Sequence, residues 1–213
     1  MDELYLPSEK LIIYTLDMVG TFACAVAATV LAKRLRMDIF GALLLSFVGA
    51  VGGGTLRDVL LDRHPVFWLH DLNYCYLIVA TSLTVQVFYH QFERFDKIMR
   101  WFDALGLAAF TVIGIEAAIS KNMDVPVIMM MGIMTAVAGG IMRDVVGRQL
   151  PLLMHKEIYI TAAFAGSLFY LALLHAGVSL WVRDVATLLL IFALRMLAVY
   201  RKWNLPDITL PAK

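Results

Sequence analysis

The sequence predicts an all-α integral membrane protein, with seven transmembrane helices arranged as two inverted three-helix repeats plus a seventh helix. Composition is the first observation: 61% of the residues are hydrophobic and 16% are charged, against roughly 45–50% and about 25% in soluble domains. An internal repeat is the second, and glycine clusters at matching positions in the two copies are the third. We expect residues 1–213 to form a single membrane domain.

The apolar residues gather in seven stretches, each long enough to cross a hydrocarbon core of about 30 Å as a helix. The stretches are 11–31, 39–56, 72–89, 104–120, 125–142, 158–174 and 185–200. They are continuously apolar and do not alternate with a period of two residues, which excludes a transmembrane β-barrel. Asp38 and Asp124 precede the second and fifth stretches and are the expected N-cap residues there.

The internal repeat determines the predicted architecture. Residues 17–76 align with residues 103–162 at a constant offset of 86, without a gap and with 15 identities. Each copy contains three spans, so the second copy enters the membrane upside down, and a pseudo-two-fold axis in the membrane plane relates the two. We therefore assign 11–91 to repeat one, 103–175 to repeat two and 181–200 to the unpaired seventh span.

The distribution of basic residues predicts the orientation. With seven spans, the loops and terminus on the C-terminal side carry twelve lysines and arginines, whereas those on the N-terminal side carry five. Because positive loops stay in the cytoplasm, we expect the C-terminus in the cytoplasm and the N-terminus outside. The net charge of +1 gives no support for nucleic-acid binding.

Glycines interrupt the second span of each repeat, as Gly52, Gly53 and Gly54 in the first copy and Gly139 and Gly140 in the second. A helix break there frees backbone groups that must find partners in protein or water. Breaks at equivalent depths in inverted repeats point to a permeation or binding site. The alternative is close helix packing, because small residues let helices approach.

An Arg-Asp pair follows each glycine cluster. The two pairs are Arg57-Asp58 and Arg143-Asp144. Adjacent helical residues point about 100° apart, so each side chain is free to meet Asp17 or Asp103, near the start of the first span of each repeat, instead of its neighbour. The pairs either set the electric field at a pore mouth or lock the end of a bent helix as structural ion pairs.

Isolated polar residues inside the spans complete the candidate set. Hydroxyls of Ser46, Thr55 and Thr135 are able to replace part of an ion's hydration shell, although most such hydroxyls bond back to their own helix. Glu116 is the one carboxylate deep in the fourth span and is a candidate for function or for a supporting ion pair. No catalytic set, metal-ligand spacing or phosphate loop is present, so we expect no enzyme activity, cofactor or metal.

Two segments carry a family resemblance. GGGTLRDVLL (52–61) and AGGIMRDVV (138–146), each in a helix begun by Met-Asp, resemble the bacterial group named for a glycine-transporter domain, which is related to the trimeric intracellular cation (TRIC) channels. The resemblance covers roughly residues 10–200.

The resemblance implies a multi-pass protein of the cell's inner (plasma) membrane, assembled as a symmetric homotrimer within the lipid bilayer. It implies an hourglass pore in each protomer, lined by helices 39–60 and 125–146 bent at their glycines, that passes monovalent cations, potassium and sodium. The name of the bacterial group implies a different activity, secondary transport of glycine or another small neutral amino acid. A structural or assembly protein is a third possibility, against which the glycine breaks argue.

Overall fold

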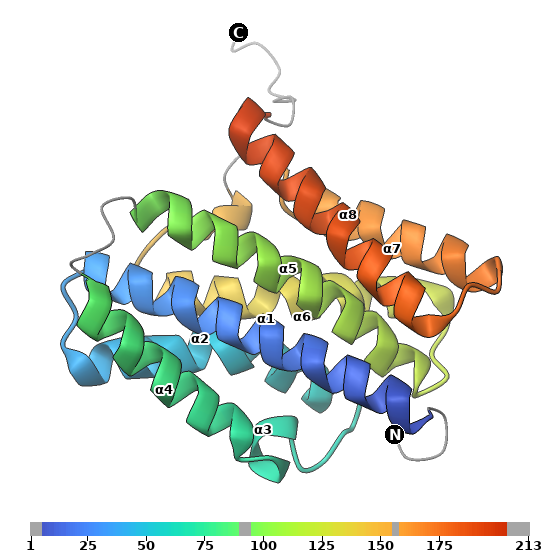
Figure 1. Ribbon diagram of the computed structural model, residues 1–213, viewed down its shortest axis with the longest axis horizontal. Helices are drawn as coiled ribbons and strands as arrows, with labels where there is room; N and C mark the ends of the chain where they lie inside the picture. Colours follow the sequence, from blue (N-terminus) through green and yellow to red (C-terminus); the bar gives the residue numbers. More distant parts are fainter. Residues whose placement is uncertain (1–5, 90–94, 155–157, 204–213) are drawn as a thin grey trace, which may run out of the picture.

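The computed structural model describes residues 6–89, 95–154 and 158–203, and these residues form helices and no β-strand (Figure 1). The elements are α1 (Pro7–Arg34), α2 (Ile39–Leu60), α3 (Phe67–His70), α4 (Asn73–Phe88), α5 (Phe95–Ile119), α6 (Val125–Val146), the 3-10 helix η2 (Leu152–Met154), α7 (Ile160–His175) and α8 (Leu180–Arg201). Four of them, α1, α2, α5 and α6, are long and apolar enough to cross a membrane. α4 and α7 are apolar but only 16 residues long.

The predicted all-α membrane fold is confirmed, and the count and bounds of its helices are corrected. The described residues contain eight α-helices instead of seven, because a four-residue helix, α3, follows α2. The fourth predicted span starts earlier than expected, at Phe95. The helix that contains the seventh apolar stretch, 185–200, starts at Leu180, one residue before the assigned span 181–200, so Arg183 and Asp184 belong to the helix. The first turns of these two helices contain charged residues, and a span defined by its apolar residues therefore begins too late.

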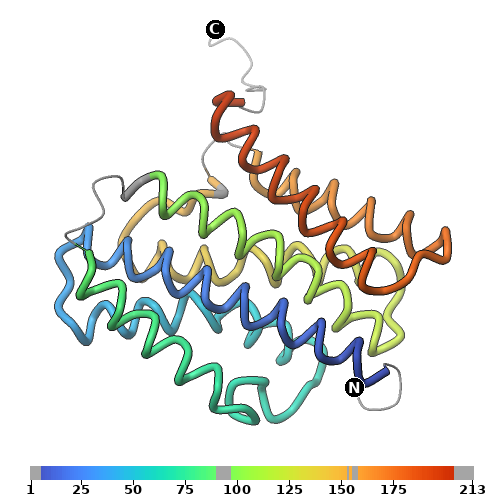
Figure 2. Tube along the Cα trace, viewed as in Figure 1, coloured from blue at the N-terminus to red at the C-terminus, as the bar shows by residue number. Residues whose placement is uncertain are grey.

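The helices form a bundle in which α1 lies beside α5, and α2 lies beside α6 behind them (Figure 1). The chain colours in Figure 2 show that α1 and α5 run in opposite directions across the bundle. α5 is the most buried of the four long apolar helices. The α7–α8 hairpin packs against it at one side, so α5 is the centre of the fold.

The turns that follow the first two helices of each predicted repeat have the same geometry. Arg36 and Asn122 follow α1 and α5 with φ of 57° and 53°, and Asp62 and Arg148 follow α2 and α6 with φ of 49° and 52°. Both pairs are separated by the offset of 86 residues. Non-glycine residues seldom adopt the left-handed region, so the shared conformation is independent support for the alignment.

One helix start differs between the two copies. The Asp38 side chain accepts a hydrogen bond of 2.6 Å from the backbone N–H of Gly41, which confirms the predicted cap of α2. Asp124 precedes α6 without such a bond. Pro126 stands in the first turn there, where its ring supplies a helical φ and lacks an N–H that would need a cap.

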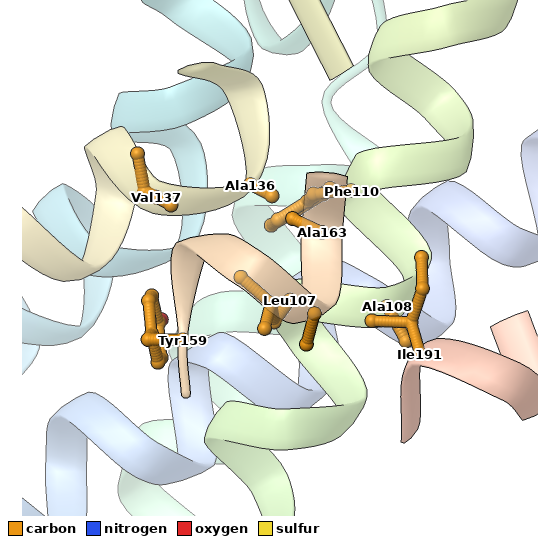
Figure 3. Packing of buried hydrophobic residues seen from close by; sticks show 9 residues of the cluster. Leu107, Ala108, Phe110, Ala136, Val137, Tyr159, Ala163 and Ile191 are labelled. Atoms are coloured by element: carbon orange, nitrogen blue, oxygen red, sulfur yellow. The ribbon is translucent and has the colours of Figure 1, made fainter. Parts of the chain in front are cut away.

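The largest buried apolar cluster joins four helices (Figure 3). Leu107 and Phe110 of α5 meet Val137 of α6, Ala163 of α7 and Ile191 of α8. Lipid tails are as apolar as these side chains, so close packing, more than exclusion of water, holds the helices together in a bilayer.

Candidate functional site

α2 and α6 cross with their backbones in direct contact at glycines. A Cβ atom on Gly53 would overlap the carbonyl oxygen of Thr135, and a Cβ on Gly139 would lie 2.6 Å from the carbonyl oxygen of Gly49. The offset of 86 pairs Gly53 with Gly139 and Gly49 with Thr135. The two contacts are therefore reciprocal, which is the signature of a two-fold relation between the helices.

The first helices of the two copies make the same kind of contact. A Cβ on Gly20 of α1 would lie 3.1 Å from the Phe110 ring of α5, and a Cβ on Gly106 of α5 would overlap the Cys24 sulfur of α1. Gly20 and Gly106 are separated by 86 residues, as are Cys24 and Phe110. The local two-fold relation thus extends through four helices.

The glycines serve close helix packing, and neither α2 nor α6 is interrupted at them; the predicted bend at these glycines stays a prediction. α2 is helical without interruption from Ile39 to Leu60, and α6 from Val125 to Val146. Gly52 faces the sulfur of Met142, which would lie 2.7 Å from a Cβ there. The helices therefore continue through the glycine clusters without an unwound segment.

The remaining two glycines of the motifs differ in the space beside them. A Cβ on Gly54 would lie 2.5 Å from the ring of Phe67 in α3, so the glycine lets α3 fold back on α2. A Cβ on Gly140 would meet nothing nearer than the Tyr159 hydroxyl at 3.4 Å. Gly140 is thus the glycine with room for a side chain.

A buried ion cluster lies at the C-terminal end of α2; we call Asp17, Arg57, Asp58, Arg63 and Tyr74 the Asp17 cluster. Arg57 Nε donates to Asp58 Oδ1 at 2.9 Å, and Arg63 lies 3.4 Å from the same oxygen. Asp17 interacts electrostatically with Arg57 and accepts a hydrogen bond of 3.0 Å from the Tyr74 hydroxyl. The two arginines balance the two carboxylates.

A second cluster lies at the C-terminal end of α6; we call Asp103, Arg143, Asp144, Tyr159 and Arg195 the Asp103 cluster. Arg143 donates to Asp103 Oδ1 and to Asp144 Oδ1, both at 2.8 Å. The Arg195 guanidinium lies 4.9 Å from the centre of the Tyr159 ring. Arg143 is 2% exposed, so both bonds are shielded from competing water.

The predicted site residues are thus brought together in two sets, and the structure corrects how they pair. Adjacent Arg and Asp bind each other in both copies, which the helical spacing alone did not predict. Each Asp also fixes the following loop: Asp58 accepts from the N–H of Phe67 at 2.9 Å, and Asp144 from that of Leu152 at 3.0 Å.

Sequence reasoning missed the second arginine of each cluster. Gln149 stands at the position equivalent to Arg63, and Arg195 of α8 supplies the positive charge near the second cluster instead. The sequence did offer a signal for Arg195: it is a lone arginine inside an apolar span, and such a charge needs a buried partner. Tyr74 and Tyr159 had no comparable signal and look like interface aromatics.

The three hydroxyl candidates bond to backbone carbonyls. Ser46 donates to Ala25 O at 3.2 Å, and Thr55 and Thr135 donate to carbonyls of the preceding turn at 2.8 and 2.6 Å. Thr55 also accepts from the indole N–H of Trp68. These hydroxyls stabilise helix packing in the structure described, which matches the simpler of the two expectations.

Glu116 of α5 lies near α8. It is 2% exposed, and one of its oxygens is 3.8 Å from Arg183. Its carboxyl group also lies within hydrogen-bonding range of Asp184, which is fully buried. Among residues 6–89, 95–154 and 158–203, no three His, Cys, Asp or Glu side chains gather in a way that fits a metal ion.

Known proteins resemble this chain in sequence over most of its length. A family model described as "Glycine transporter" matches residues 14–90 and 100–175. The inner membrane protein YadS of Escherichia coli K12 is 41% identical over 161 residues, which cover 75% of this chain and 78% of that protein. A membrane protein of Vibrio cholerae is 39% identical over 173 residues, covering 79% and 71% of the two chains.

Solved structures resemble it in fold. A TRIC trimeric intracellular cation channel orthologue from Rhodobacter sphaeroides is 33% identical, with a TM-score of 0.87 over 90% of this chain and 99% of that chain. A structure described as a prokaryotic TRIC channel is 28% identical, with a TM-score of 0.86 over 92% and 100% of the two chains. The neighbours are ion channels and not enzymes, as the sequence predicted.

Proposed function

Because this chain belongs to the glycine-transporter family and has the fold of the TRIC channels, we propose that it is a cation channel of the bacterial inner (plasma) membrane. The permeant ions are monovalent cations, potassium and sodium. The observation that carries the proposal is the likeness, at 33% identity and over nine-tenths of the chain, to a solved cation channel. That neighbour is described as trimeric, and the proposed assembly of this chain is a homotrimer with a conduction path in each protomer.

The proposed topology is that of seven spans, formed by α1, α2, α4, α5, α6, α7 and α8. The reciprocal glycine contacts and the opposite directions of α1 and α5 support two inverted repeats, 11–91 and 103–175, with α8 as the appended span. The excess of basic residues on one side supports a cytoplasmic C-terminus and an outer N-terminus.

The proposed conduction path follows α2 and α6. The two helices run in opposite directions in the proposed topology, so the Asp17 cluster and the Asp103 cluster lie toward opposite faces of the membrane, one at each mouth. Their carboxylates are paired with arginines, which keeps each mouth close to neutral for an approaching cation. The crossing at Gly53 and Gly139 is the narrowest point, and conduction requires α2 and α6 to separate there.

Secondary transport of glycine is the second candidate, favoured by the description of the matching family model. Transporters of this architecture hold substrate at interrupted helices near the middle of the membrane. α2 and α6 are uninterrupted, and Glu116, the buried carboxylate that such a transporter would use as its coupling group, lies 3.8 Å from Arg183 of α8. The geometry therefore supports the channel more than the transporter.

Flux in proteoliposomes distinguishes the two functions, with potassium and glycine tested separately. For a channel we expect potassium flux that follows the electrical gradient and no saturable glycine uptake. Gly54→Leu, which adds bulk against Phe67 of α3, and Gly140→Leu, which adds bulk beside Tyr159 of the Asp103 cluster, are each expected to block that flux at a proposed mouth. Saturable glycine uptake without potassium current would replace the channel with the transporter, and unchanged flux in both variants would refute the path.

A further inference from the structure

A basic and aromatic cleft opens between the N-terminal end of α5 and the C-terminal end of α8, and no residue of α2 or α6 is among its described lining residues. Its volume is about 540 Å³, and its lining includes the cations Lys97, Arg100 and Lys202 and the indoles of Trp101 and Trp203. No carboxylate is among its described lining residues. The cleft therefore gathers three cationic side chains around one open hollow.

Rigid packing fixes the floor of the cleft. The Trp101 ring meets the Phe192 ring of α8 edge to face, with centroids 5.6 Å apart. Trp101 and Trp203 nevertheless remain 44% exposed each. Indoles that are half covered by protein and half open prefer the boundary between hydrocarbon and water. The cleft thus lies at the level of the lipid headgroups.

The ends of α5 and α8 that form the cleft lie on the side of the chain with the excess of lysine and arginine, the cytoplasmic side by the positive-inside rule. The anions concentrated at this boundary are phospholipid headgroups. We propose that the cleft binds the phosphate of an anionic phospholipid, with Lys97, Arg100 and Lys202 around the phosphate and the two indoles beside the glycerol region. This site is independent of ion conduction.

The experiment compares two triple variants with equal loss of charge. The cleft variant is Lys97→Gln, Arg100→Gln and Lys202→Asn, where Asn suits the left-handed backbone at residue 202 (φ 51°). The control variant is Lys33→Gln, Arg148→Asn and Arg201→Gln, three cations of the same membrane side that do not line the cleft.

Retention of phosphatidylglycerol and of phosphatidylcholine by the detergent-solubilised protein is measured by native mass spectrometry, alongside the melting temperature of each variant. Each cation near a phosphate contributes about 5-fold in affinity, so we expect on the order of 100-fold weaker phosphatidylglycerol binding in the cleft variant. The control variant and phosphatidylcholine binding should change by less than about 3-fold.

Three results would overturn the proposal. Equal losses in the two triple variants would mean that total charge, and not this cleft, holds the lipid. Equal retention of the two lipids by the wild-type protein would remove the requirement for an anion. Competition by inorganic phosphate at the same concentration as the lipid would identify a soluble anion as the ligand. Where the cleft variant unfolds, Lys97→Gln alone is used, with an expected loss of about 5-fold.

Discussion

Alanine at Gly139 and alanine at the adjacent Gly140 are chemically the same change with opposite expected outcomes. Both residues lie in the interior of α6. The new methyl group at residue 139 points at the backbone of α2, 2.6 Å from the carbonyl oxygen of Gly49. At residue 140 the nearest atom is the Tyr159 hydroxyl at 3.4 Å, an ordinary contact.

The expected magnitudes follow from these two distances. Replacing helical glycine with alanine favours the helix by about 1 kcal/mol at either position. At residue 139, α2 and α6 must also move apart by 3.4 − 2.6 = 0.8 Å to restore an ordinary contact, and overpacking of this kind costs about 1–3 kcal/mol. The gain in helix propensity is the same in both variants, so only the overpacking cost separates them. Gly139→Ala should therefore be less stable than Gly140→Ala by about 1–3 kcal/mol.

Unfolding of both variants in the same detergent measures the stability difference, and potassium flux in proteoliposomes measures the effect on the proposed path. Since Gly139→Ala separates α2 from α6 at their crossing, it should change the flux by more than about twofold, whereas Gly140→Ala should preserve it. Gly139→Ala as stable as Gly140→Ala would refute the close crossing. A stability difference with no change in flux would refute only the placement of the path.

Three further predictions concern buried polar groups. Arg143→Gln leaves the buried carboxylate of Asp103 without its arginine partner and should lower the unfolding free energy by about 3–5 kcal/mol in denaturation experiments. Adding Asp103→Asn should recover part of that loss. Full stability of Arg143→Gln would contradict the buried pair. Glu116→Gln replaces one of two buried carboxyl groups within hydrogen-bonding range with an amide that donates to Asp184. The melting temperature should stay level or rise with flux unchanged, and lost flux would instead give Glu116 a functional role. Thr135→Val removes a hydroxyl that donates to a carbonyl of its own helix, so potassium flux should stay within about twofold of the wild-type value. A larger loss of flux would mean that this hydroxyl binds the permeant ion.

The sequence was sufficient for the broad class of fold, and it is the basis of the proposed inverted repeat. Hydrophobic stretches predict helices in a membrane because an isolated span must satisfy its own backbone hydrogen bonds. The offset of 86 residues also located the motif residues of both clusters, and the turns after α1, α2, α5 and α6 share their geometry at that spacing. These features are local, so a linear pattern records them.

The tertiary structure alone decided what the glycines and charges do. A glycine pair is equally compatible with a helix break and with a close crossing, and only the approach of Gly139 to the backbone of α2 selects the crossing. Likewise, Arg195 comes from a helix outside the repeat and meets Tyr159 of the second cluster. Which side chains meet depends on how each helix is rotated and tilted against its neighbours, and the spacing of residues along one helix does not contain that information.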